Sequence, residues 1–328
     1  MGMFWSSDMG KNLSYAGLPD SHHIGRIVID PRNPDHVVVA VLGHLYSPNE
    51  ERGIFKTTDG GKTWSRTLYI NEYTGMIDLV AAPDNPEVLF AASWERDRKA
   101  WNFKGSGPGS GIYKSSDGGD TWALMTQSGA GFPTGEGVGR IGLAAFDSNT
   151  VYAILDNQYR RPDTSDKKEP SELQKEDLRN ISVADFTALD NARLNAFLKS
   201  NGFPEEYRAD TVKEMVRNGS IRPDDLISYL EDANSVLFDT PVIGAEVYKS
   251  TDGGRAWNKT HKGFIEDLYY SYGYFFGQIR VAPYDPDQIY IVGVPILRSD
   301  NGGASFTSIN GANVHADHHA LWVNPDLK

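Results

Sequence analysis

A short segment that ends in an aromatic residue recurs along the chain. It is clearest at 57–64 (TTDGGKTW) and returns at 115–122 (SSDGGDTW) and 250–257 (STDGGRAW). Weaker copies stand at 6–10 and 299–306. Asp-Gly-Gly supplies the positive φ angles of a tight hairpin turn. Each copy therefore predicts a turn whose Asp accepts backbone amide hydrogen bonds, with a Ser or Thr hydroxyl tying the first strand to it and the Trp packing over it.

A second unit precedes most of these turns. It is an apolar strand, a turn rich in Pro, Asn and Asp, and another apolar strand, seen at 25–41, 79–92, 139–155 and 277–292. A last copy of its first strand is predicted at 320–325. Together the two units make a four-stranded antiparallel sheet with the Asp-Gly-Gly turn between its third and fourth strands. Such a repeat predicts a blade of a β-propeller, and the apolar first and second strands indicate packing between neighbouring blades.

The number of units predicts an all-β propeller of about five blades, four complete and one assembled from both ends of the chain. The alternative is an open arc of a larger ring, whose exposed edges would favour self-association. Residues 157–242 interrupt the third complete blade between its second and third strands and are charged, with a helical pattern. We therefore expect propeller segments at 1–156 and 243–328 and an α-helical insertion between them.

Helix boundary signals support this insertion. Ser182-x-x-Asp185 is a capping-box pattern, and Asn201-Gly202 before a proline predicts a helix end. Asp210 is expected to cap a helix that starts at the next residue, and Pro223 fits a first helical turn.

The recurring turn resembles the Asp-box, or BNR, repeat, Ser-x-Asp-x-Gly-x-Thr-Trp, of sialidases, sortilin-type receptors and xyloglucan-cleaving enzymes. Segments 20–27, 43–46 and 314–319 also look typical of long bacterial proteins labelled as BNR-repeat glycosyl hydrolases or sortilin-like. The resemblance covers nearly the whole chain. It implies a hydrolase without naming a substrate, and it indicates the fold more strongly than the activity because enzymes and receptors both carry the repeat.

Composition narrows the possible partners. A net charge of −12 argues against nucleic acid, and the lack of cysteine excludes thiolate metal sites and disulfides. No apolar run reaches the length of a membrane span. Relatives of this kind are commonly longer and exported, although no signal peptide is visible, so a shortened form or a fragment is expected and the compartment stays open.

The blade pattern brings the starts of first strands and the ends of second strands to one mouth of the propeller. Six of the eight histidines map to this mouth or its approach: His22, His23, His44, His315, His318 and His319. Alternation along a strand puts His315, Asp317 and His319 on one face, where a divalent ion such as Ca²⁺ or Zn²⁺ could bind. His22, His23, His318 and His319, with Asp317, are also candidate catalytic acid–base groups. Alternatively, these histidines cap the channel and bond to the backbone.

The same mouth carries further polar and aromatic candidates. Glu95 is a candidate catalytic acid, and Arg26 and Arg140, at equivalent first-strand positions, would hold an anionic or carbonyl group. The predicted substrate-binding residues are Arg26, His44, Trp94, Arg96, Arg140, Tyr270 and Tyr272. Aromatic rings of this kind stack on sugars, while carboxylates supply the acid and the base. Alternatively, the tyrosines pack at a joint between two blades. The alternative for residues 94–98 is a surface loop with local ion pairs.

These features predict a hydrolase that acts on a small or carbohydrate-like substrate in a glycosidase-like manner, with no cofactor assigned beyond the divalent metal. One alternative is a lactonase or esterase that depends on a Ca²⁺-type ion. The other is a propeller that binds a peptide or glycan without catalysis. The Tyr–Glu nucleophile pair of sialidases has no assignable counterpart here.

Overall fold

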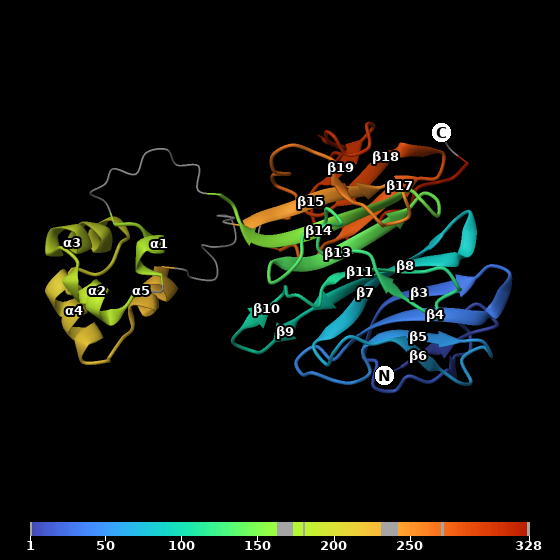
Figure 1. Ribbon diagram of the computed structural model, residues 1–328, viewed down its shortest axis with the longest axis horizontal. Helices are drawn as coiled ribbons and strands as arrows, with labels where there is room; N and C mark the ends of the chain where they lie inside the picture. The colour runs from blue at the N-terminus through green and yellow to red at the C-terminus, as the bar shows by residue number, and fades with distance from the viewer. Residues whose placement is uncertain (1, 163–172, 180, 231–241, 270–271, 327–328) are drawn as a thin grey trace. The chain divides into compact units, whose positions relative to one another are not determined.

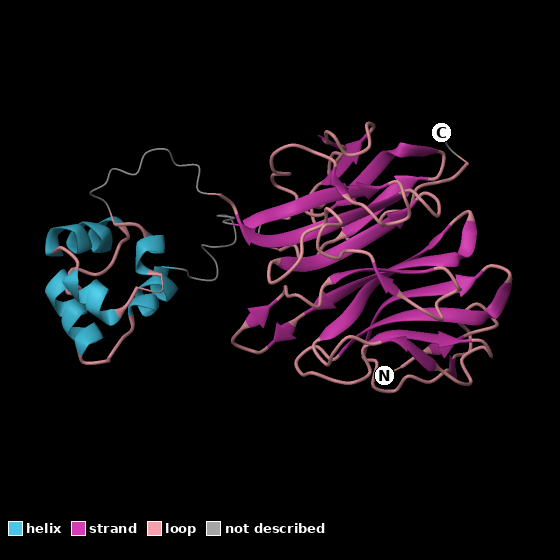
Figure 2. Ribbon diagram, in the orientation of Figure 1, coloured by secondary structure: helices cyan, strands magenta, loops and turns pink. Residues whose placement is uncertain are grey.

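The computed structural model of the 328-residue chain describes residues 2–162, 173–179, 181–230, 242–269 and 272–326. The chain divides into two compact units, the first formed by Met1–Arg160 with Thr240–Lys328 and the second by Arg161–Asp239 (Figure 1). The first unit is built of strands and the second of helices, as Figure 2 shows. None of the described helices is long and apolar enough to cross a membrane.

The described part of the first unit contains four four-stranded antiparallel sheets and two two-stranded ones. The first sheet contains β3 (His23–Asp30), β4 (Asn33–Gly43), β5 (Gly53–Thr57) and β6 (Ser65–Leu68). The second sheet contains β7 (Thr74–Ala82), β8 (Asn85–Glu95), β11 (Gly111–Ser115) and β12 (Ala123–Leu124), and the third contains β13 (Val138–Ala145), β14 (Val151–Arg160), β15 (Val242–Ser250) and β16 (Asn258–Lys259). The fourth sheet contains β17 (Gln278–Ala282), β18 (Asp285–Val292), β19 (Ile296–Ser299) and β20 (Thr307–Ser308). In each sheet the strands lie side by side in chain order, which confirms the predicted four-stranded unit.

The sheets pack face to face in the order of the sequence (Figure 1). Their second strands are apolar because both faces are covered: Val39, Ala40 and Val41 in β4 are fully buried, as is the equivalent stretch Val151–Leu155 in β14. Neighbouring sheets interlock through apolar side chains from consecutive sheets, for example Phe90, Val138 and Tyr248 in one cluster. The core is therefore a series of layers between sheets.

Glycines in the first strands allow the closest approach between sheets. A Cβ on Gly25 of β3 would lie 2.5 Å from the Ile77 carbonyl oxygen of β7, and one on Gly142 of β13 would lie 1.7 Å from the carbonyl oxygen of Gly277. Any side chain at these positions would collide with backbone of the next sheet, so glycine is required by packing here.

The first strands also converge through polar contacts. Asp78 of β7 is 3% exposed and accepts hydrogen bonds from Arg26 Nε of β3 at 2.8 Å and from the Leu143 amide of β13 at 2.9 Å. Arg26 Nη2 also donates to Gln278 Oε1 at 2.5 Å, which joins the first sheet to the fourth. These side chains tie four sheets together along their first strands.

The Asp-Gly-Gly turns connect the third and fourth strands, as predicted. In the first complete copy, Thr57 Oγ1 donates to Asp59 Oδ1 at 2.7 Å and accepts from the Gly61 amide at 3.0 Å, while Asp59 accepts from the Thr63 amide at 2.9 Å. Gly60 and Gly61 have φ angles of 71° and 86°. The same bonds recur around Ser115, Ser250 and Ser299, so each turn is held by its own residues.

The buried hydroxyl in these turns predicts a measurable loss on removal. Thr57→Val keeps the shape of the side chain but leaves the Gly61 amide without its acceptor in a site where Thr57 is only 2% exposed. We expect the free energy of unfolding to fall by about 2 kcal/mol, the cost of an unsatisfied buried donor, in a urea titration. Thr58→Val, at the exposed neighbour, is the matched control, and equal stability of the two variants would contradict the assigned role.

Both ends of the chain differ from the prediction. Residues 320–325 form no strand, and Trp322 is 75% exposed; the Leu321 carbonyl accepts a hydrogen bond from Arg280 instead of entering a ladder. At the other end, β1 (Phe4–Trp5) and β2 (Ser14–Tyr15) pair only with each other. The described residues therefore form no blade from the two ends, because 320–325 is not a strand and the β1–β2 pair is joined by no third strand.

The second unit is a small bundle with its own core. Its helices are α1 (Lys175–Leu178), α2 (Val183–Ala188), α3 (Asn191–Ser200), α4 (Ala209–Arg217) and α5 (Pro223–Leu230). Ser182 caps α2 through the Asp185 amide, and α3 ends before Gly202, both as predicted. The predicted cap at Asp210 is wrong: α4 begins at Ala209 with no side-chain cap, because the Asp210 carboxylate accepts from Asn191 Nδ2 of α3.

Candidate functional site

The starts of first strands and the ends of second strands meet at one end of the sheets, which we call the polar mouth. The strand pairings His23 with Gly43, Thr74 with Glu95, Val138 with Asn157, and Gln278 with Val292 define it. The hairpin of β9 (Asp97–Arg98) and β10 (Phe103–Lys104) follows β8 directly at this end. The Asp-Gly-Gly turns lie at the opposite ends of the strands.

Arg52, Arg98 and Arg140 act electrostatically on Arg96 at the polar mouth, and we call these four residues the arginine cluster. Arg96 stands at its centre and is 6% exposed. Burial, followed by the charges of the other three arginines, lowers its pKa to about 10. Arg96 donates through Nη2 to the carbonyl of His44 at 3.2 Å, but its buried Nε has no hydrogen-bond partner.

Arg140 approaches the same place from β13. Its Nη1 donates to the carbonyls of Tyr274 and Phe275, both at 2.9 Å, and its buried Nε is also without a partner. The guanidinium carbon atoms of Arg140 and Arg96 lie 6.0 and 5.4 Å from the ring of Trp94. Trp94 itself is 3% exposed and donates to the Gly105 carbonyl. Trp94 therefore packs against the two guanidinium groups, and its ring is too buried to stack on a sugar.

Arg52 and Arg98, the other two members of the cluster, have different contacts from each other. Arg52 is buried and donates to the carbonyls of His44, Ser47 and Tyr73, so its contacts hold the loops in place. Arg98 lies over the ring of Phe103, 5.4 Å from its centroid. An excess of buried positive charge with free N–H groups is the usual environment for an anion.

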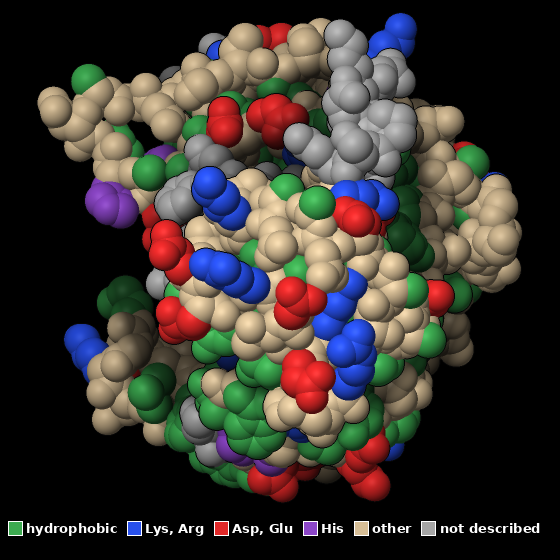
Figure 3. All heavy atoms as spheres, turned by 90° about the vertical axis from the view of Figure 1, so that its left-hand side faces the viewer, with side chains coloured by type: hydrophobic (Ala, Val, Ile, Leu, Met, Phe, Trp, Pro, Cys, Tyr) green, Lys and Arg blue, Asp and Glu red, His purple; other side chains and the backbone are tan. Residues whose placement is uncertain are grey.

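The positive charge is concentrated only at the arginine cluster. The chain as a whole carries a net charge of −12, and on the face shown in Figure 3 acidic and basic side chains are interspersed. Near the cluster, Asp97 is paired with Lys99 at 2.9 Å. The side-chain hydrogen bonds of Arg96 and Arg140 go to backbone carbonyl groups.

A buried carboxyl group lies next to Arg140 at the end of the polar mouth. Asp156 of β14 is 3% exposed, and burial raises its pKa to about 7, against the opposing effects of a hydrogen bond from Gln158 and the charge of Arg140. Tyr269 is also buried, its hydroxyl has no partner, and burial and Asp156 raise its pKa. Asp156 therefore changes charge near neutral pH beside a cationic site.

Glu95 is the more accessible carboxylate at the polar mouth. It ends β8 immediately before Arg96; its Oε2 accepts from the Gly109 amide at 2.8 Å and its Oε1 lies 3.4 Å from Lys104 Nζ. The side chain is 17% exposed.

The histidines near the N-terminus gather around the end of β4. The rings of His22 and His44 have centroids 3.9 Å apart, and His23 Nδ1 bonds to the Gly43 carbonyl at 2.9 Å. Burial, followed by the charge of His22, lowers the pKa of His44. Asp20 lies beside His22 and His44.

The histidines near the C-terminus gather around other residues. Asp317 Oδ1 pairs with His319 Nε2 at 2.9 Å, the His319 ring stacks on Phe276, and His318 Nδ1 bonds to the Val294 carbonyl at 3.0 Å. Tyr272 and His315 line the same shallow cavity as His319. The ligand atoms of His315, Asp317 and His319 do not converge as a three-residue metal group, because His315 Nδ1 turns toward the carbonyl of Ala316.

The predicted site residues therefore divide into three places. Arg96 and Arg140 belong to the arginine cluster, Trp94 contacts both of them, and Glu95 precedes Arg96 in the chain. A second group contains His22, His23 and His44. A third contains His315, Asp317, His318, His319 and Tyr272. Among the described residues, no hydrogen bond, ion pair or ring contact joins the second group to the third. Arg26 is engaged by Asp78 and Gln278, and Tyr270 lies outside the described residues.

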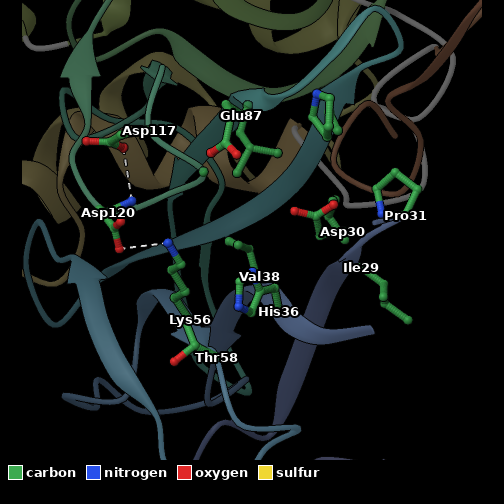
Figure 4. A pocket seen from close by; sticks show the side chains of 15 residues that line it. Ile29, Asp30, Pro31, His36, Val38, Lys56, Thr58, Glu87, Asp117 and Asp120 are labelled. Carbon is green, nitrogen blue, oxygen red and sulfur yellow. Dashed lines mark hydrogen bonds and ion pairs between the residues drawn. The ribbon is translucent and has the colours of Figure 1, made fainter. Parts of the chain in front are cut away.

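Another cavity opens at the opposite end of the strands, between the first and second sheets. It has a volume of about 330 Å³ and is lined by charged groups that include Asp30, Lys56, Glu87 and Asp120 (Figure 4). Lys56 Nζ pairs with Asp120 at 2.7 Å, and Arg32 bridges Asp30 and Glu87. Lys56 and Arg32 are therefore already paired with carboxylates and neither cation is free for a ligand, so the polar mouth is the stronger candidate site.

Comparison with known proteins supports the fold. No protein-family model matches the chain, and no curated protein matches its sequence. The GH74 enzyme of Niastella koreensis has a TM-score of 0.50 and 16% identity, over 93% of this chain and 34% of that one. The GH74 xyloglucanase of Xanthomonas campestris has a TM-score of 0.46 and 13% identity, over 92% and 34%. The chain spans about a third of the length of these structures. The first likeness supports a propeller-like, mostly β fold built of antiparallel sheets.

Proposed function

We propose that this protein is a glycosidase-like hydrolase whose polar mouth takes an anionic, carbohydrate-like substrate. The observation that carries the proposal is the arginine cluster, in which Arg96 and Arg140 each keep a buried Nε without a partner. An unpaired buried donor is costly unless a ligand satisfies it. A carboxylate or sulfate on a sugar would accept from both guanidinium groups and neutralise their charge.

Hydrolysis needs a carboxyl group as proton donor, and we propose Glu95 for this role. It adjoins Arg96 in sequence and is partly exposed at the end of β8. We assign it as the group that gives a proton to the leaving oxygen. Asp156, by contrast, is covered by the backbone near Gly273 and acts through its charge on Arg140.

We propose that the four sheets are successive blades of one propeller and that their turns are Asp-box turns. The hydrogen bond from Arg26 to Gln278 supports an axis shared by the first and fourth sheets. The repeated bonds around Thr57 and Ser115 support a common turn motif.

The test compares a uronate-containing oligosaccharide with its neutral counterpart of equal length. We expect cleavage of the charged substrate alone, measured by chromatography of the products.

Arg96→Gln should lower kcat/KM roughly 10- to 100-fold, because a hydrogen bond to a charged group is worth about 1.5 to 3 kcal/mol. Glu95→Gln should lower kcat and leave the affinity for the uncleaved substrate within about twofold, because it removes a proton donor and no anion contact.

A charge-matched control separates the site from the general field of the protein. Arg255→Gln removes an exposed arginine at an Asp-Gly-Gly turn, at the opposite end of the strands, and should leave kcat/KM unchanged. Equal cleavage of the neutral oligosaccharide, or an unaffected Arg96→Gln variant, would contradict the proposal. Tight binding of the charged oligosaccharide without turnover would identify a binding module in place of an enzyme.

A further inference from the structure

The second histidine group holds three potential metal ligands close together. One ligand atom from each of Asp20, His22 and His44 lies within 4.8 Å of the others. Asp20 and His22 precede β3, and His44 follows β4, so two segments that are paired at the edge of the first sheet bring them together. Among the described residues, this is the one group of three or more such side chains with that spacing.

His44 is oriented as a metal ligand would be. Its Nδ1 lies 2.9 Å from Ser47 Oγ, and its buried Nε2 has no partner. A hydrogen bond to one ring nitrogen commonly fixes the tautomer and the direction of the other nitrogen, which then binds the ion.

The backbone around the group is held firmly. His22 has a φ of 48° and bridges to Gly43, a conformation that is costly for a residue other than glycine or asparagine. The Asp20 amide donates to Glu51 Oε2 at 2.8 Å, and Asn49 Nδ2 donates to the Asp20 carbonyl at 3.1 Å. These contacts hold the backbone that carries Asp20 and His22, and the contact with Ser47 holds the ring of His44.

We propose that Asp20, His22 and His44 bind one divalent transition-metal ion of the Zn²⁺ class. Two imidazole nitrogens and one carboxylate oxygen suit Zn²⁺ or Co²⁺, whereas Ca²⁺ prefers six or more oxygen ligands. Three protein ligands leave a coordination position for water. The proposal does not depend on hydrolysis at the arginine cluster, because its ligands are different residues.

Metal binding to the whole protein tests this inference directly. After treatment with a chelator and its removal, the protein is titrated with Zn²⁺ by calorimetry and with Co²⁺ by visible absorption. We expect one equivalent of Zn²⁺ to bind and intense Co²⁺ bands typical of a low coordination number. We also expect Zn²⁺ to raise the Tm, because an ion that binds the folded state alone stabilises it.

Variants of the ligands give the decisive comparison. His44→Ala should weaken Zn²⁺ binding at least 100-fold, and Asp20→Asn, at an exposed position, should weaken it about tenfold. His22→Asn keeps a residue that tolerates a positive φ and should also lose the Co²⁺ bands. His36→Ala, at the opposite end of β4, is the matched control and should bind as the wild type does.

Two results would overturn the site. One is the absence of stoichiometric Zn²⁺ binding by the wild type. The other is undiminished binding by His44→Ala and Asp20→Asn, which would place the ion elsewhere. The Tm of each metal-free variant is measured as well; a variant that has lost the fold is set aside, and Asp20→Asn, which changes one exposed group, then decides.

Discussion

Replacing Asp156 with asparagine is expected to stabilise the protein at pH 8 by about 4 kcal/mol and to leave its stability at pH 4 nearly unchanged. The pKa of this carboxyl is about 7 in the fold against an ordinary 3.8, and each pKa unit corresponds to about 1.4 kcal/mol. Because the folded state binds the proton more tightly, wild-type stability falls as the pH rises from about 4 to about 7 and stays low above that range. Urea titrations across this range measure the slope.

The asparagine variant should lose most of that slope, because its amide stays neutral and can still accept from Gln158. Asp287→Asn, at an exposed carboxylate paired with Lys249, is the control and should keep the wild-type slope. An asparagine variant that is less stable than the wild type at pH 8 would show instead that ionised Asp156 and Arg140 form a favourable buried pair.

The same variant bears on the proposed function. Ionised Asp156 offsets the charge of Arg140, so anions should bind more tightly below pH 7 than above it. A neighbouring unit charge is worth roughly 1 to 2 kcal/mol at an effective dielectric constant near 20, which corresponds to about tenfold in affinity. In Asp156→Asn the affinity of an uncleaved uronate oligosaccharide at pH 8 should match that of the wild type at pH 6. Calorimetry at both pH values measures it.

Gly142→Ala is expected to lower the free energy of unfolding by roughly 3 kcal/mol or more. The new Cβ would lie 1.7 Å from the Gly277 carbonyl oxygen and 2.7 Å from its carbon. Both are backbone atoms, so β13 and the start of the fourth sheet must move apart. Denaturation in urea measures the loss, with Gly311→Ala as the control, since the Cβ there would meet only the side chain of Val314 at 3.1 Å. Equal stability of the two variants would contradict close contact between these sheets.

The sequence was most informative where the structure is local. The Asp-Gly-Gly turns were predicted in detail because the bonds around Asp59 join residues at most four positions apart. The order of strands within each sheet followed from apolar runs and turn residues alone. The end segment at 320–325 was predicted as a strand on the same pattern, but a strand also needs a partner beside it, which its own residues do not specify.

The site was predicted less completely because its chemistry arises from packing. The pattern placed Arg96 and Glu95 at the polar mouth, but the mutual approach of Arg52, Arg96 and Arg140 depends on how three sheets meet. Asp156 was missed, although it directly precedes Asn157, which pairs with the start of a first strand as Glu95 does, and that equivalence was the available signal. Its altered pKa comes from the segment around Gly273, which is remote in sequence.

The attachment of the helical unit has a consequence for how the chain is assembled. Arg160 and Val242, at the inner ends of β14 and β15, face each other in the ladder. The polypeptide therefore leaves the sheet and re-enters it at neighbouring points. The helical unit is therefore an insertion that the sheets do not need. β14 and β15 meet as they would on either side of a short hairpin loop, whether or not that loop contains helices.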